Sequence, residues 1–226
     1  MNISNEFQNY YVNHLGKGSL DLYYHNQKIE NSMTPYILEE RELRVTQMDI
    51  FSRLMRDRLL WVAGGVDDRM STVVQAQLMF LDSTDKTDIT MHIDSPGGSV
   101  KSGLSMVDVM QYISCDIRTV NTGMAASMGS VLLGAGTKGK RSSLRFSKTM
   151  LHQTSGGAGG NIQDARINFV EWEKTNKILF ELLGDFCGKT AEQVTKDAER
   201  DFWLSAEEAL EYGIIDEIVK TKKKGK

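Results

Sequence analysis

Residues 121–139 read NTGMAASMGSVLLGAGTKG. An apolar run that favours a β-strand, residues 117–120, comes directly before this stretch, and we predict that the strand breaks at Gly123. A helix is expected to begin near Ala126. Ser127 would then lie where a strand turns into a helix, a position from which a hydroxyl group can be presented to a substrate.

Small side chains surround Ser127. Ala125, Ala126 and Gly129 allow a sharp backbone turn, and the amides at the start of the helix favour negative charge. The match to the nucleophile motif G-x-S-x-G is imperfect, because Ala125 stands where the first glycine would be. A serine at a helix start is usually only a cap, so a catalytic role depends on residues elsewhere in the chain.

The chain has 226 residues, of which 40% are hydrophobic and 25% charged, an ordinary mixture for a globular protein. Its net charge of −3 gives no reason to expect nucleic acid, and no apolar run approaches the roughly 18 residues of a membrane span. Cys115 and Cys187 match no metal spacing and favour a reducing compartment. Because residues 1–33 lack an apolar signal core and any arginine, we expect a cytoplasmic protein.

Strand and helix patterns alternate through the middle of the chain. Strands are predicted at residues 59–63, 89–93 and 117–120, and the helices between them at residues 68–81 and 99–113. This alternation predicts an α/β fold with a parallel sheet, right-handed crossovers and a site at the carboxyl ends of the strands. Gly97, Gly98 and Ser127 follow such ends.

The remaining segments are an N-terminal extension, an amphipathic helix, a long helix, a capped helix, two strands and a basic tail. We place them at residues 1–33 (extension, flexible or a propeptide), from 48 (helix), 149–153 (strand), 161–186 (long helix), 205–213 (capped helix), 214–219 (strand) and 220–226 (tail). At 1.5 Å per residue the long helix would measure about 39 Å. Part of it should therefore project and meet another subunit.

Acyl transfer by a serine needs a base. The chain has four histidines: His14 and His25 lie in the extension, His92 lies inside a predicted strand, and His152 lies at a strand end beside a glycine-rich run. An isolated histidine is more often a surface or satisfied core residue than a catalytic one. His152 is the candidate base because of its place at the strand end.

The base needs an orienting carboxylate, and the oxyanion needs amide donors. Asp201 stands at an apolar boundary, but the residues alone do not favour it over Asp197 or Asp216. Residues 96–98, Pro-Gly-Gly, let backbone amides approach a ligand with no Cβ in the way. The amide of Met128 at the helix start is a second candidate donor. Taken alone, Pro-Gly-Gly is more simply a tight turn.

Residues 134–140 resemble two phosphate-binding motifs, G-x-G-x-x-G and most of a P-loop. Both motifs must follow a strand and open a helix, whereas this run follows the helical pattern of residues 128–133. The Ser or Thr that follows the P-loop lysine is Arg141 here. We interpret the run as a helix end and turn, and we expect that this chain does not itself bind ATP.

Six motifs occur together in one order. They are Ser95-Pro-Gly-Gly-Ser, Gly123-Met-Ala-Ala-Ser-Met-Gly, Lys138-Gly-Lys-Arg, Met150-Leu-His-Gln, Glu199-Arg-Asp and Ser205-Ala-Glu-Glu-Ala-Leu-Glu-Tyr-Gly. Over about residues 34–219 the chain strongly resembles the family of Clp protease proteolytic subunits (ClpP). The resemblance implies a crotonase-like fold of repeated β-β-α units with a protruding handle at about residues 150–186. It also implies a serine endopeptidase that hydrolyses unfolded proteins inside a tetradecamer of two stacked seven-membered rings.

Matched position by position, the resemblance implies a role for five residues. Ser127 corresponds to the nucleophile, His152 to the general base and Asp201 to the orienting acid. Gly98 and Met128 correspond to the donors of the oxyanion hole. No metal and no cofactor is implied for this chain.

The resemblance also implies partners. An Hsp100 AAA+ unfoldase of the ClpX, ClpA or ClpC type would use ATP and feed unfolded chains into the chamber, and Arg200 would contact the opposite ring. Neither nucleic acid nor a membrane is expected.

Several positions depart from the family pattern. Thr154 replaces a proline after His-Gln, Gly160 and Asn161 replace glutamine-rich handle positions, and Thr90 and His92 replace two tyrosines of the unfoldase docking pocket. Two alternatives therefore stay open: a non-catalytic or variant subunit of a mixed ring, and a crotonase-type acyl-CoA enzyme. The latter shares the fold and an amide oxyanion hole but needs a nucleotide pocket.

Overall fold

The computed structural model describes residues 36–41, 44–155 and 161–220. Its chain divides into two compact units, with the boundary between Arg53 and Leu54. The expected extension, most of the glycine-rich run and most of the basic tail lie outside the described residues.

The described part of the first unit contains a β-hairpin. Strands β1 (Tyr36–Arg41) and β2 (Arg44–Asp49) pair antiparallel, with Tyr36 opposite Asp49. The helix expected from residue 48 begins slightly later, as α3 (Ile50–Arg56). The Asp49 carboxylate accepts hydrogen bonds from the amides of Phe51 and Ser52, both at 3.0 Å, so this side chain defines the helix start.

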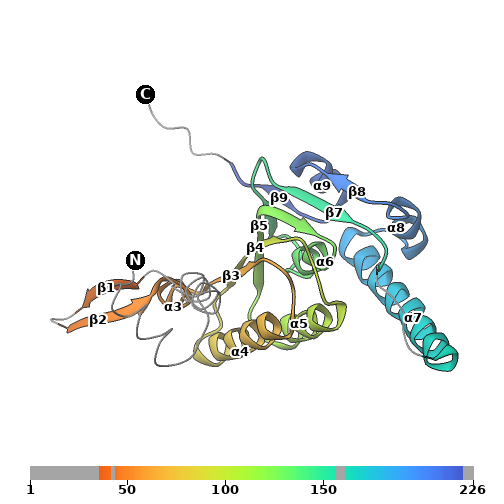
Figure 1. Ribbon diagram of the computed structural model, residues 1–226. Helices are drawn as coiled ribbons and strands as arrows, with labels where there is room; N and C mark the ends of the chain where they lie inside the picture. The colour runs from red at the N-terminus through yellow and green to blue at the C-terminus, as the bar shows by residue number, and fades with distance from the viewer. Residues whose placement is uncertain (1–35, 42–43, 156–160, 221–226) are drawn as a thin grey trace, which may run out of the picture. The chain divides into compact units, whose positions relative to one another are not determined.

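The second unit is built on a seven-stranded sheet in which neighbouring strands are mostly parallel (Figure 1). Its strands are β3 (Leu59–Ala63), β4 (Ile89–Ser95), β5 (Ile117–Ala126), β6 (Arg141–Ser143), β7 (Lys148–Leu151), β8 (Phe202–Leu204) and β9 (Glu217–Ile218). The order is β3-β4-β5-β6-β9; β7 also pairs with β5, and β8 pairs antiparallel with β7. The predicted α/β class with a parallel sheet is confirmed.

One strand is longer than the sequence indicates. We expected a break at Gly123 and a helix from about Ala126, but β5 continues to Ala126 and the helix begins at Met128. The first half of β5 pairs with β6, and its second half pairs with β7, where Ala126 lies opposite Met150. Pairing with β7 keeps the backbone extended beyond Gly123, which would otherwise favour a turn.

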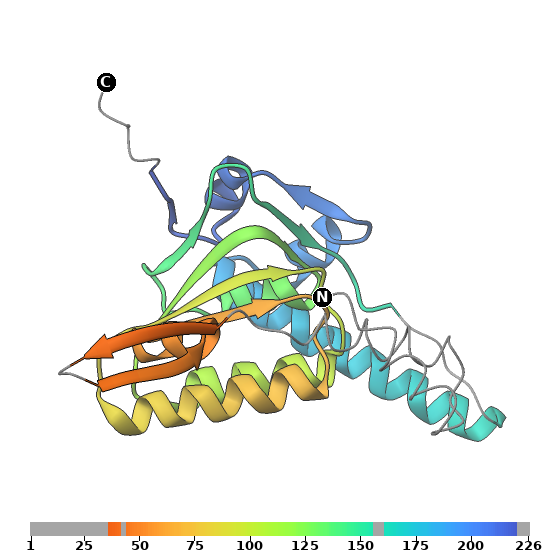
Figure 2. The ribbon, with the colours of Figure 1, turned by 60° about the vertical axis from the view of Figure 1, so that its left-hand side comes forward.

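Helices cover the sheet. They are α4 (Asp68–Thr84), α5 (Val100–Tyr112), α6 (Met128–Gly134), α7 (Ile162–Cys187), α8 (Ala191–Asp197) and α9 (Ala206–Tyr212). Helices α4 and α5 lie side by side on one side of the sheet in both ribbon views (Figures 1 and 2). All seven residues of α6 are buried, so the helix that follows Ser127 is held on every side.

The long helix was predicted to within one residue at each end. It begins after Asn161, whose side chain caps the first turn, and ends at Gly188, which takes the left-handed conformation (φ 68°). Its buried residues lie in the C-terminal third, from Leu179 to Gly184. The rest projects from the sheet (Figure 2) and exposes apolar side chains at Ile162, Ile167, Phe169 and Val170.

The C-terminal helix follows its local signals. Ser205 and Glu208 form the predicted capping box at the start of α9, and Gly213 ends the helix with φ 91°. The run that resembled a phosphate loop is the end of α6 followed by a turn, as predicted. Five short elements, β1, β2, β6, α8 and β8, were not predicted, because three to seven residues carry too little periodicity. None of the described helices combines the length and apolarity needed to cross a membrane.

Candidate active site

Ser127 lies at the junction between β5 and α6 in a strained backbone conformation. Its φ is 53° and its ψ is −122°, and among the described non-glycine residues only Arg58 shares a positive φ. The Ser127 hydroxyl makes no capping hydrogen bond to the helix. The simple capping role is therefore excluded, and the sharp turn leaves the hydroxyl free for another partner.

That partner is His152. The imidazole Nε2 lies 2.8 Å from the Ser127 Oγ, a hydrogen-bond distance. His152 directly follows β7, which pairs with the end of β5, and the Ser127 amide donates to the Met150 carbonyl at 2.9 Å. The pairing of two strand ends thus brings together two residues separated by 25 positions.

Asp201 completes a line of three side chains. One carboxylate oxygen lies 3.5 Å from the Nδ1 of His152, and the two side chains are 61% and 21% exposed, respectively. Strand β8 explains this placement, because Phe202 lies opposite Leu151 in its antiparallel pairing with β7. This pairing brings Asp201, the residue before Phe202, beside His152, the residue after Leu151.

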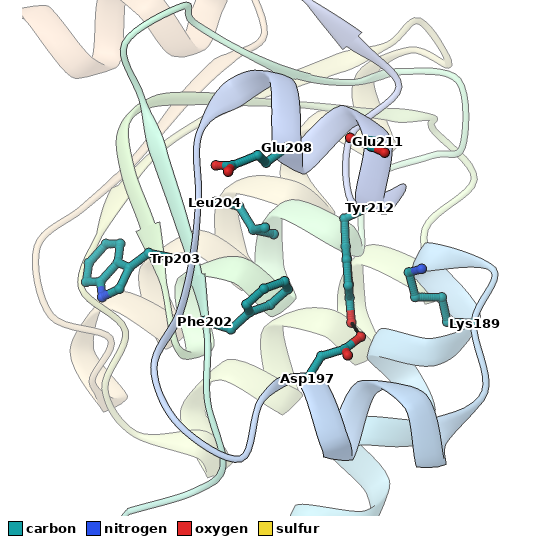
Figure 3. Close-up of a pocket in the computed structure, with 8 residues that line it drawn as sticks. All are labelled: Lys189, Asp197, Phe202, Trp203, Leu204, Glu208, Glu211 and Tyr212. Carbon is teal, nitrogen blue, oxygen red and sulfur yellow. Dashed lines mark hydrogen bonds between the residues drawn. The ribbon is translucent and has the colours of Figure 1, made fainter.

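The two other candidate acids have partners of their own. The Asp197 carboxylate accepts a hydrogen bond from the hydroxyl of Tyr212 at 3.0 Å, in a pocket bounded by α9, β8 and α8 (Figure 3). Burial and this hydrogen bond raise the pKa of Tyr212. Asp216 pairs with the buried guanidinium of Arg141 at 2.6 Å. Burial alone would raise the pKa of Asp216, but the hydrogen bonds from Arg141 outweigh it and lower that pKa.

The Pro-Gly-Gly turn packs closely against this site. Gly97 and Gly98 have φ values of 92° and 149°. A Cβ on Gly97 would lie 2.6 Å from the Ser127 Cβ, and one on Gly98 would lie 2.3 Å from the Val66 carbonyl oxygen. Val66 holds the turn, since its amide donates to the Gly97 carbonyl and its carbonyl accepts from the Ser99 amide, both at 2.8 Å. Only glycine fits at both positions.

The turn leaves amide donors free near the serine. Among the described residues, none accepts a hydrogen bond from the amide of Gly98 or of Met128. Both residues line a single pocket together with Ser127 and His152. The other lining residues are Val100, Ser130, Val131, Thr154, Ser155, Leu179 and Leu183. This pocket can hold a carbonyl group with its oxygen directed at the amides and its carbon at the hydroxyl.

Sequence reasoning missed the residues that support this arrangement. Val66 carries no sequence signal for its role. Gln153 donates from its amide to the Ala198 carbonyl at 3.2 Å and from its side chain to the Glu199 carbonyl at 3.0 Å, so it joins the histidine segment to the aspartate segment. Only its adjacency to His152 could have drawn attention to it.

His92 lies outside the site. It stacks on Trp61 with ring centroids 4.6 Å apart, and burial lowers its pKa. His14 and His25 fall outside the described residues, and the inter-ring role of Arg200 stays a prediction.

A serine hydroxyl, an imidazole and a carboxylate in line, beside two free amides, define a site of the serine hydrolase class. A family model described as Clp protease matches residues 40–222. The chain is 47% identical over 221 residues to the ATP-dependent Clp protease proteolytic subunit of Porphyromonas gingivalis, covering 97% of this chain and 100% of that relative. It therefore belongs to the Clp protease family, whose members are serine peptidases with a crotonase-like fold.

Two further relatives carry the same name. The protein from Bacteroides fragilis (strain YCH46) is 47% identical over 215 residues, covering 95% of this chain and 98% of the relative. The protein from Streptococcus gordonii is 47% identical over 190 residues, covering 83% and 97%. The similarity thus extends over nearly the full length of each relative.

Proposed function

We propose that this chain is the proteolytic subunit of an ATP-dependent Clp protease and that Ser127 is its nucleophile. The observation that carries the assignment of Ser127 is the 2.8 Å contact between its Oγ and the Nε2 of His152. A serine hydroxyl is a weak nucleophile until a neighbouring base takes its proton, and His152 is placed to do so.

In the proposed reaction the Ser127 Oγ attacks the carbonyl carbon of a peptide bond while its proton moves to the Nε2 of His152. The Asp201 carboxylate holds the ring by its Nδ1–H and stabilises the imidazolium. The amides of Gly98 and Met128 donate to the oxyanion. The C–N bond then breaks, and His152 gives its proton to the departing amine. Water, deprotonated by the same imidazole, hydrolyses the acyl-enzyme and restores Ser127.

We further propose that the chain works inside a tetradecamer of two stacked seven-membered rings. The exposed apolar side chains on the projecting part of α7 support this assembly, because they are the kind of surface that a second subunit would cover. An Hsp100 unfoldase would supply unfolded proteins and use the ATP, and this chain would need no cofactor. The free thiols of Cys115 and Cys187 suit a cytoplasmic location.

Active-site labelling tests the assignment. A fluorophosphonate should modify the wild-type protein at Ser127, and peptide mass mapping should find Ser130, which lines the same pocket, unmodified. S127A should take up no label and cleave no fluorogenic peptide, yet assemble to the same mass. Cleavage by S127A at the wild-type rate would remove Ser127 from its role.

Protein degradation separates the alternatives. With an Hsp100 unfoldase and ATP, the wild-type protein should degrade an unfolded substrate, and S127A should not. Rings that leave peptides uncut in every combination of subunits would indicate a scaffold. Tight binding of coenzyme A without serine labelling would indicate an acyl-CoA enzyme.

A further inference from the structure

The segment that follows His152 is held by one side chain of the long helix. Thr154 directs two donors at the Oδ1 of Asn176: its amide at 2.9 Å and its hydroxyl at 3.2 Å. Asn176 lies near the middle of α7, 22 residues further along the chain. A single amide oxygen therefore joins the helix to the second residue after the histidine.

This contact matters because the β-ladder ends before the histidine. The last ladder pair of β7 is Leu151 with Phe202, so His152 is not itself fixed by strand pairing. The next residue, Gln153, is bonded to the carbonyls of Ala198 and Glu199. Thr154, the residue after Gln153, is bonded to α7 through Asn176.

Thr154 also lies close to the reacting groups. Thr154 lines the pocket that contains Ser127 and His152, and both Thr154 and Asn176 are half-buried. If Asn176 released Thr154, the bonds from Gln153 to the carbonyls of Ala198 and Glu199 would remain, but the segment after His152 would be held less firmly. The 2.8 Å contact of the imidazole with the Ser127 Oγ would then be kept less often. Proton transfer depends steeply on such positioning.

We propose that Asn176 is a positioning residue for the general base: its Oδ1 holds Thr154 and thereby keeps His152 aligned with Ser127. This inference rests on the proposed role of His152. The contact needs Thr154 as well as Asn176, because a proline at position 154 would have no N–H and no hydroxyl to donate. Alignment of the base is thus coupled to the position of α7, the helix proposed to meet the opposite ring.

The test compares four variants in the full-length protein. N176L has similar volume but no acceptor oxygen, and N176D keeps an acceptor oxygen at the same place. T154P removes both donors. T175A is the matched control, since among the described residues the partner of the Thr175 hydroxyl is the Glu171 carbonyl within the helix. Values of kcat and KM are measured with a fluorogenic peptide at the plateau of the pH profile, together with thermal unfolding and assembled mass.

Loss of one or two hydrogen bonds in this setting should lower kcat by about 3- to 30-fold in N176L. KM should stay within about twofold, because the hydrogen bond serves the base and not the bound peptide. N176D should recover most of the loss, and T175A should match the wild type. Adding N176L to T154P should lower kcat no further, because the shared contact is already gone.

The inference is overturned by wild-type kcat in N176L, by failure of N176D to recover activity, or by independent losses in N176L and T154P. If N176L does not assemble, T154V decides, since it removes only the hydroxyl bond: a fall in kcat of about twofold supports the inference and an unchanged kcat overturns it. Fluorophosphonate labelling keeps the two proposals distinct. An unlabelled wild type defeats the assignment of Ser127, whereas normal labelling with unchanged kcat in N176L defeats the positioning role alone.

Discussion

Replacing Gly98 by alanine should disable the proposed oxyanion site. The added Cβ would lie 2.3 Å from the Val66 carbonyl oxygen and 2.8 Å from the Val66 amide nitrogen, whereas ordinary contact begins at 3.4 Å. The turn must therefore move away from Val66 by about 1 Å. Such a movement breaks the two 2.8 Å hydrogen bonds that Val66 makes with Gly97 and Ser99, and it displaces the Gly98 amide.

The magnitude follows from these contacts. Removal of one oxyanion donor costs on the order of 100- to 1,000-fold in kcat, and a 1 Å misplacement alone costs on the order of 100-fold. Each of the two lost hydrogen bonds is worth about 0.5–1.5 kcal/mol. An alanine at the φ of 149° adds backbone strain of about 1–3 kcal/mol. Together these effects should lower the free energy of unfolding by about 2–6 kcal/mol.

The assay is steady-state cleavage of a fluorogenic peptide by G98A, with thermal unfolding and assembled mass measured on the same samples. G139A is the matched control, because Gly139 also has a positive φ of 86° but has nothing within 4 Å of an added Cβ. G139A should lose about 1–2 kcal/mol of stability and keep its kcat. A kcat of G98A close to that of G139A would refute the assignment of Gly98 to the oxyanion site.

Three further outcomes are expected. D201N should lower kcat/KM by on the order of 100-fold or more, because the imidazole loses its orienting charge, while D197N should keep its activity; equal effects would contradict the choice of Asp201. R141L should lower the free energy of unfolding in urea by about 3–5 kcal/mol, because it leaves the Asp216 carboxylate without its buried partner. The pKa of Asp216 is below its ordinary value of 3.8 in the folded state, so its contribution to stability is present above that value and is lost as the pH falls through the folded pKa. D216N should therefore show a flatter fall in melting temperature between about pH 5 and pH 2 than the wild type, and parallel curves would contradict this linkage.

Much of the fold is readable from local signals. Strand β3 and helix α7 were predicted to within one residue, because each has a long or sharply bounded hydrophobic pattern. The capping box at Ser205 and the glycine end at Gly213 were also correct, since each depends on hydrogen bonds within a few residues. The full extent of β5 was not predicted, because its second half is held extended by β7, which follows later in the chain.

In the candidate site, too, some features follow from local sequence and others depend on tertiary contacts. The sequence by itself determined that Ser127 would follow a strand and begin a helix, that residues 96–98 would turn tightly, and that His152 would lie at a strand end, because neighbours along the chain govern these features. The residues alone left three carboxylates open, the family resemblance pointed to Asp201, and the tertiary structure gives the physical reason for that choice. Antiparallel pairing of β8 with β7 places Asp201 beside His152, while Asp197 and Asp216 are bound to Tyr212 and Arg141.

The contact from Asn176 to Thr154 likewise came from the tertiary structure, since no pattern in a helix marks which residue will meet a strand end 22 positions earlier. Contacts over such separations depend on how elements pack, and packing is settled by the whole core and not by adjacent residues. The chain's local sequence therefore provides the reactive groups, and the pairing of strand ends with distant segments gives them their alignment.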